Sequence, residues 1–132
     1  ASVTALYNQN GIETFQSDEE NTVLRNPVNG VVLRGNDETT NLYNPAGICA
    51  FQADNDNIAL RNSLDRVIFR GNYETTDLYN PGNVNTFHSD TNNTILTSPT
   101  GNCAIFLEND KIEFTIHGAI VAYVDATGFH NA

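Results

Sequence analysis

The sequence is poor in basic residues, and this scarcity excludes several kinds of partner. Only six of its 132 residues are Arg or Lys, against sixteen Asp or Glu, which gives a net charge of −10. Because phosphate groups are bound by basic surfaces, we expect no nucleic-acid partner and no attraction to anionic membranes. The chain also lacks an apolar run of membrane-spanning length, so membrane insertion is not expected.

Methionine and tryptophan are absent, and cysteine occurs only twice. The chain begins with Ala-Ser-Val and shows no signal-peptide pattern, so we interpret it as a mature product whose leader has been removed. This interpretation favours an extracellular or cell-surface location. Two cysteines cannot define a disulfide scaffold, and we expect Cys49 and Cys103 to be small buried thiols.

Sequence motifs of catalysis are lacking as well. The three histidines, His88, His117 and His130, do not have the spacing of metal ligands. The chain contains no nucleophile elbow, no phosphate-binding Walker loop and no His-Glu-x-x-His motif. We therefore predict that the protein is not an enzyme.

What the sequence does contain is a large apolar residue at every ninth position. The nonamers combine a β-branched and apolar block, such as residues 21–25, with a block of turn formers, such as 26–29. Each nonamer predicts a short strand followed by a tight turn. Because side chains alternate along a strand, the repeated residues share one face, which is the predicted core. The fourteen repeated residues are Leu6, Phe15, Leu24, Leu33, Leu42, Phe51, Leu60, Phe69, Leu78, Phe87, Leu96, Ile105, Phe114 and Tyr123.

A longer repeat of 36 residues contains four nonamers. Residues 34–36, Arg-Gly-Asn, recur at 70–72, and residues 38–45 recur almost unchanged at 74–81. An internal repeat of this kind indicates one architecture built from copies of one unit. We expect a single β-repeat domain over residues 1–132, with repeats at 3–38, 39–74 and 75–110 and a partial repeat at 111–132.

The favoured fold is all-β: a two-sheet parallel β-solenoid, or β-roll, of about seven coils. Two strands and eighteen residues per coil explain the strict register, because an insertion would disturb stacking on the next coil. The nonamer period resembles the calcium-binding repeats of secreted bacterial toxins, but the chain lacks their glycines, so their calcium sites are not carried over. The solenoid would also stack one column of side chains into an amide ladder: Asn8, Asn26, Asn44, Asn62 and Asn80.

A β-trefoil of three 36-residue repeats is the alternative fold. The pattern Leu6-Tyr7, Asn10-Gly11, Phe15 and Thr22-Val23 resembles the opening of fibroblast-growth-factor-type trefoil repeats. Fourteen predicted strands, against the twelve of a trefoil, argue against this fold. A trefoil would make the protein a lectin that binds a glycan in three pockets, each with an aromatic platform beside amide groups. The candidate glycan-binding residues are Tyr7, Tyr43, Tyr79, Asn8, Asn44 and Asn80.

Two kinds of turn alternate along the chain. One kind begins with Asn or Ser and contains all four prolines, whereas the other contains eleven of the sixteen acidic residues. One edge of the molecule is therefore predicted to be acidic. Divalent cations with oxygen ligands relieve repulsion between carboxylates, so calcium is the one cofactor that the sequence suggests. Acidic turns that only keep a β protein soluble are the alternative. The candidate calcium ligands are Asp18, Glu20, Glu38, Asp54, Asp56, Glu74 and Asp90.

The C-terminal segment predicts association between copies. Its strands have apolar residues on both faces, and such strands must be covered twice. Open solenoid ends would add unpaired strand edges. We therefore predict a non-catalytic, secreted homo-oligomer that self-assembles into an extracellular or surface structure such as a filament, layer or fibre. The candidate assembly residues are Ile120, Val121, Tyr123 and Val124.

Overall fold

The computed structural model describes residues 2–132, and these residues form fifteen β-strands and no helix. The all-β prediction is confirmed. The chain divides into two units, the first ending at Arg66 and the second covering Val67–Ala132. The first unit contains β1 (Thr4–Tyr7), β2 (Glu13–Ser17), β3 (Thr22–Arg25), β4 (Val31–Gly35), β5 (Thr39–Tyr43), β6 (Cys49–Asp54) and β7 (Ile58–Arg61). The second contains β8 (Val67–Gly71), β9 (Thr76–Tyr79), β10 (Asn85–Ser89), β11 (Asn93–Thr97), β12 (Cys103–Glu108), β13 (Ile112–Ile116), β14 (Ala119–Asp125) and β15 (Gly128–Asn131).

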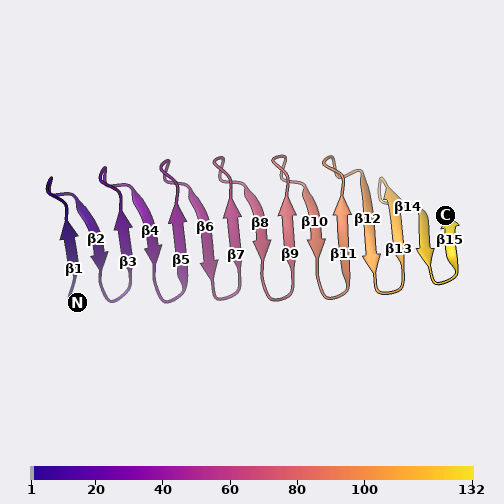
Figure 1. Cartoon of the computed structure of the whole chain (residues 1–132), viewed down its shortest axis with the longest axis horizontal. Helices are drawn as coiled ribbons and strands as arrows, with labels where there is room; N and C mark the ends of the chain where they lie inside the picture. The colour runs from indigo at the N-terminus through magenta and orange to yellow at the C-terminus, as the bar shows by residue number, and fades with distance from the viewer. Residues whose placement is uncertain (1) are drawn as a thin grey trace. The chain divides into compact units, whose positions relative to one another are not determined.

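In each unit the strands form an open antiparallel meander, so that neighbours in the chain are neighbours in the sheet (Figure 1). The prediction of a two-sheet parallel solenoid is therefore wrong. The trefoil alternative is wrong too, because a trefoil closes its strands into a barrel and these sheets are open. A period of nine residues cannot distinguish a parallel solenoid from an antiparallel meander. A short strand followed by a tight turn repeats at the same interval whether the chain coils onward or reverses.

The turns explain why the chain reverses at each strand end. In the turn from β1 to β2, the N–H of Asn8 donates to the carbonyl of Ile12 at 2.9 Å. The side-chain Oδ1 of Asn8 accepts from the N–H groups of Asn10 and Ile12, at 2.9 and 3.0 Å. Asn26, Asn44 and Asn62 accept backbone N–H groups in the same way, and Asn80 accepts that of Val84. The predicted amide ladder is therefore wrong, because these Oδ1 atoms bind the backbone of their own turns.

A left-handed residue completes each of these turns and bends the chain back into a hairpin. Gly11 in the first turn has a φ of 74°. A turn followed by a residue of positive φ is a common antiparallel hairpin connection, and it places a bulge in the adjoining pair of strands. The residues at the matching positions of the later turns also have positive φ: Asn29, Gly47, Asp65, Asn83 and Gly101.

The residues of the nonamer series lie directly opposite one another in the sheets. In the first unit the register aligns Leu6, Phe15, Leu24, Leu33, Leu42, Phe51 and Leu60. In the second unit it aligns Phe69, Leu78, Phe87, Leu96, Ile105 and Phe114. A register shift between β13 and β14 places Ala122 opposite Phe114 and Tyr123 opposite Glu113. The predicted shared face is thus confirmed as one row in each unit, and Tyr123 does not join it.

These rows do not form the predicted dry core. Leu24 is 40% exposed and Leu42 is 41% exposed, and Val23 is the one buried apolar residue among residues 2–132. Val23 lies on the opposite face, between Gln16 and Arg34 in the register. The chain exposes 8716 Å², against roughly 6,900 Å² for a compact 14.5 kDa monomer. Reversal at both edges keeps each unit in a single layer, so no second sheet covers the rows.

Candidate functional site: an apolar sheet face between two unlike edges

We call the face that carries the nonamer rows the Leu/Phe face. Beside the row in the first unit runs a second row of mostly small side chains on the same face: Thr4, Ser17, Thr22, Gly35, Thr40, Ala53 and Ile58. The hydroxyls of Ser17 and Thr22 satisfy each other at 3.4 Å. Small side chains beside a straight apolar row leave a surface on which another sheet can pack.

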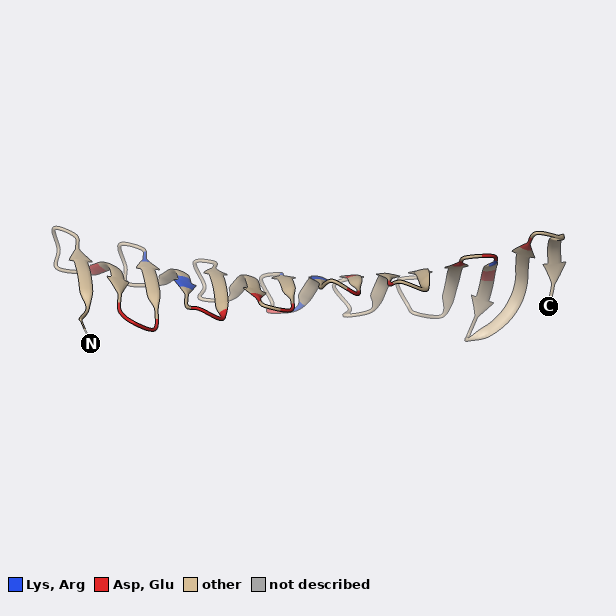
Figure 2. Ribbon diagram, turned by 90° about the horizontal axis from the view of Figure 1, so that it is seen from below, with Lys and Arg blue, Asp and Glu red and all other residues tan. Residues whose placement is uncertain are grey.

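The two edges of each sheet differ in charge. We call the edge with the turns that begin in Asn or Ser the Asn edge, and the edge with the charged turns the acidic edge. Figure 2 shows Asp and Glu gathered in the turns of the acidic edge. The predicted segregation of acidic turns to one edge is therefore present within each unit.

Some of the acidic residues stabilise their own turns. Oδ1 of Asp18 accepts the N–H groups of Glu20 and Asn21, at 2.9 and 2.8 Å. These two backbone hydrogen bonds hold the pKa of Asp18 below its ordinary value, because they favour the charged carboxylate. In two other turns, equivalent hydrogen bonds from backbone N–H groups lower the pKa values of Asp54 and Asp90.

The candidate calcium ligands are spread over five turns, with Asp18 and Glu20 in one and Asp54 and Asp56 in another. Successive turns of one edge are two strands apart, or about 10 Å, and Asp18 and Asp54 are four strands apart, or about 19 Å. Among residues 2–132, no three Asp, Glu, His or Cys side chains form a group that could hold a metal ion. The calcium prediction assumed carboxylates stacked closely on successive coils of a parallel solenoid, and the antiparallel meander does not bring successive acidic turns that close. Four of the seven candidate calcium ligands are exposed: Glu20, Glu38, Asp56 and Glu74.

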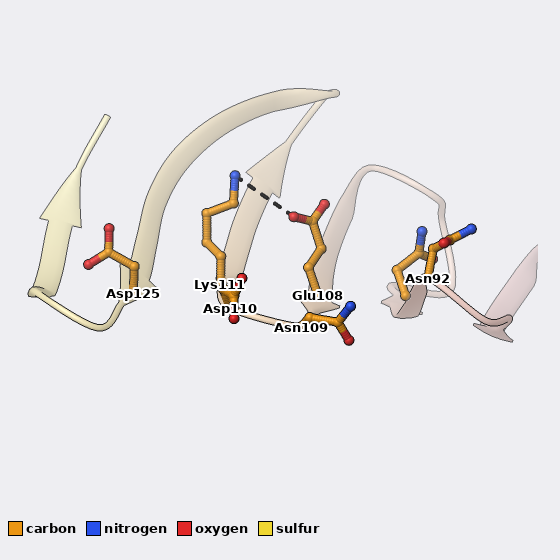
Figure 3. Close-up of a pocket in the computed structure, with 7 residues that line it drawn as sticks. Asn92, Glu108, Asn109, Asp110, Lys111 and Asp125 are labelled. Carbon is orange, nitrogen blue, oxygen red and sulfur yellow. Dashed lines mark ion pairs between the residues drawn. The ribbon is translucent and has the colours of Figure 1, made fainter.

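The acidic edge of the second unit contains an open pocket of about 530 Å³ (Figure 3). Lys111 belongs to the turn from β12 to β13, which lines the pocket, and forms ion pairs with Glu113 and, at 3.9 Å, with Glu108. The hydrogen bond from Lys111 to Glu113 is the main reason why the pKa of Lys111 is raised. Because the amine is already paired with two carboxylates, the pocket presents no unpaired cation to an anionic ligand.

A charged cluster that sequence reasoning missed lies on the opposite face of the second unit. Nδ1 of His88 is 2.6 Å from Oδ1 of Asp77, and Nε2 is 3.3 Å from Oδ2 of Asp90. Asn85 donates to the same oxygen of Asp77 at 2.7 Å, and Asp77 is 8% exposed. The hydrogen bond with Asp77 and, to a smaller extent, that with Asp90 raise the pKa of His88.

The 36-residue repeat contained a signal for this cluster. Asp77 and His88 occupy the positions that Asn41 and Gln52 hold one repeat earlier, and each pair is directly opposite in the register. The repeat thus replaces a neutral amide pair with a charged pair. The antiparallel register is needed to see this, because Asp77 and His88 are eleven residues apart in the sequence.

The residues of the lectin alternative are spread along the sheets. Tyr7 and Tyr43 end β1 and β5, four strands apart, and Tyr79 ends β9 in the second unit. Oδ1 of Asn8 and Asn44 binds turn N–H groups, as described above. Within the first unit, therefore, the two tyrosines lie at separate places along the Asn edge. Glycan binding stays a prediction.

The candidate assembly residues divide between the two faces of β14. Ile120 and Val121 are 44% and 40% exposed. Tyr123 lies opposite Glu113 and stacks on His130, with ring centroids 4.6 Å apart. Val124 aligns with Phe129 of β15, which is 64% exposed. Val121 thus remains accessible for association, whereas Tyr123 is engaged within its own unit.

An apolar groove of about 480 Å³ on the second unit also reaches Val121. It is lined by the row residues Leu96, Ile105 and Phe114, so it continues the Leu/Phe face. Cys103 lines this groove and is exposed, so the prediction of a buried thiol at this position is wrong. Cys49 is partly buried, and burial raises the pKa of its thiol. Both cysteines are free.

No protein-family model matches the chain, and no curated protein matches it. The described residues include no helix that is long and apolar enough to cross a membrane.

Proposed function

We propose that the protein is a non-catalytic structural protein whose copies self-assemble by covering one another's Leu/Phe faces. One observation carries this proposal: the residues of the nonamer rows are aligned, and alternate members such as Leu24 and Leu42 are about two-fifths exposed. Burial of apolar surface stabilises a protein by about 25 cal/mol per Å². A single-layer sheet with an exposed apolar face would therefore be stabilised substantially if a second layer covered that face.

The exposed area supports a second copy as the cover. The chain exposes 8716 Å², about 1,800 Å² more than the scaling for a compact monomer allows. A standard stable interface buries about 800 Å² on each partner, so this excess is large enough for one such interface. Face-to-face packing of two sheets about 10 Å apart would bury the rows of both copies in one step. A filament, layer or fibre outside the cell or at its surface is the form that we propose for the assembly.

Sedimentation velocity at micromolar concentration tests this proposal with two matched variants. Leu42→Glu places a charge in the Leu/Phe row, whereas Asn41→Glu places the same charge on the same strand but on the opposite face. We expect oligomers for the wild type and Asn41→Glu, and a monomer for Leu42→Glu, because the buried charge would lie unpaired in the interface. A wild-type protein that sediments as a monomer, or a Leu42→Glu variant that still assembles, contradicts the proposal.

A further inference from the structure

We propose a specific orientation for this assembly: the acidic edge of one copy lies over the Asn edge of the other. The inference rests on the proposed self-association through the Leu/Phe face and adds the direction in which the second copy must lie. The partner is a second copy of the same chain, and the first unit of each copy covers the first unit of the other.

The charges of the first unit are strongly divided between its edges. The turns of the acidic edge contain seven acidic residues: Asp18, Glu19, Glu20, Asp37, Glu38, Asp54 and Asp56. At the Asn edge, Arg25 pairs with Glu13 at 3.6 Å and Arg61 pairs with Asp65 at 3.8 Å. Arg66 adds a third arginine, so three basic residues stand against two acidic ones there. The acidic edge is thus far more negative than the Asn edge, where Arg25 and Arg61 each face a carboxylate.

Two identical faces can stack about a two-fold axis in two ways. An axis parallel to the strands places each acidic edge over the acidic edge of the other copy. The layers of stacked sheets are about 10 Å apart, which is close to the screening length of about 8 Å at physiological salt, so this repulsion is only partly screened. An axis across the strands reverses the second sheet end for end and places its acidic edge over the arginines.

The second arrangement makes a definite prediction about neighbours. Each strand then lies over the same strand of the other copy. The turn from β3 to β4, residues 26–30, would lie over the acidic turns that flank β3 and β4 in the second copy. These are residues 18–21 and 36–38. Within one copy the same groups are separated by the length of a strand, about 17 Å for five residues.

Carbodiimide cross-linking can detect this neighbourhood. Val28 is at the tip of the β3–β4 turn and is 83% exposed, so Val28→Lys adds an amine there without removing a packed side chain. The reagent joins an amine to a carboxylate in direct contact. A mixture of isotopically heavy and light protein identifies links between copies, and Val28→Gln serves as the control without the amine.

We expect heavy-to-light links from position 28 to the peptides that contain Glu19, Glu20, Asp37 or Glu38, and none with Val28→Gln. Oligomers by sedimentation without these links would overturn the orientation and leave self-assembly intact. A monomeric Val28→Gln protein would overturn the self-assembly itself. A Val28→Lys variant that alone fails to assemble would also overturn the orientation, because an added positive charge at the Asn edge should strengthen contact with an acidic edge.

Discussion

His88 is a single residue whose charge depends on carboxylates from the neighbouring strand β9 and from the turn after its own strand, β10. Asp77 on β9 and Asp90 in the turn from β10 to β11 contact its two ring nitrogens. Arg70 on β8 lies opposite Asp77, and on the other side β11 presents Ile95, which carries no charge. The hydrogen bond to Asp77 is the largest cause of the raised pKa of His88. Protonated His88 therefore neutralises a nearly buried carboxylate.

The raised pKa of His88 predicts a specific pH dependence of stability. A group whose pKa is higher in the folded state than its ordinary 6.5 stabilises the fold fully below that value. The contribution is lost as pH rises through the raised value. We expect the free energy of unfolding of the wild type to exceed that of His88→Gln more at about pH 5.5 than at about pH 9.

Urea denaturation at the two pH values measures this difference. Gln is the matched replacement, because Gln52 holds the same position in the preceding repeat. An equal difference between wild type and variant at both pH values would show that the Asp77–His88 contact does not depend on charge.

The hairpin turn is the element that determines this fold. Gly47 has a φ of 79°, and a Cβ built there would meet no atom within 4 Å. Any cost of substitution at Gly47 is therefore conformational. The equivalent position of the β3–β4 turn is Asn29, with a φ of 67°. The site thus accepts residues that tolerate the left-handed region.

We predict that Gly47→Val destabilises the protein by about 1 to 2 kcal/mol, because a branched side chain opposes positive φ. Gly47→Asn should cost clearly less. Thermal and urea unfolding of both variants would check this. Equal losses for the two substitutions would contradict the role of backbone conformation at this turn.

The strands and turns were largely readable from the sequence, and the exceptions have physical causes. The nonamer predicted the aligned rows, and the chemistry of the Asn turns marked the strand ends. The final hairpin departs from the pattern: β13 and β14 are joined through His117 and Gly118, both with positive φ, and β15 adds a strand outside the series. A bulge in this hairpin moves Tyr123 to the other face, which a strict nine-residue count does not anticipate.

At the scale of the whole molecule, the direction of the strands and the number of layers could not be read from the sequence. A repeat such as Leu24 to Leu33 has the same spacing in a parallel coil and in an antiparallel hairpin. The predicted core assumed two layers, whereas the antiparallel pairing of consecutive strands gives each unit a single layer. The Asp77–His88 pair was missed for the same reason, since it depends on antiparallel register.

The net charge of −10 predicts that association depends on salt. Copies of a strongly acidic protein repel one another, and the screening length falls from about 30 Å at 0.01 M salt to about 8 Å at 0.15 M. We expect the oligomeric fraction in sedimentation to rise with sodium chloride over this range. A fraction that falls would indicate that attraction between opposite charges, and not apolar burial, holds the assembly together.

The central claim is that the Leu/Phe face, and not its opposite, is covered in the assembly. Single cysteines introduced by Leu42→Cys and Asn41→Cys, in a background of Cys49→Ser and Cys103→Ser, probe the two faces of β5. Thiol labelling rates measured across a range of protein concentrations test the claim directly. We predict that position 42 reacts faster in dilute protein, where Leu42 is 41% exposed, and becomes protected as concentration rises while position 41 does not. Labelling at position 42 that stays fast at every concentration would contradict the account.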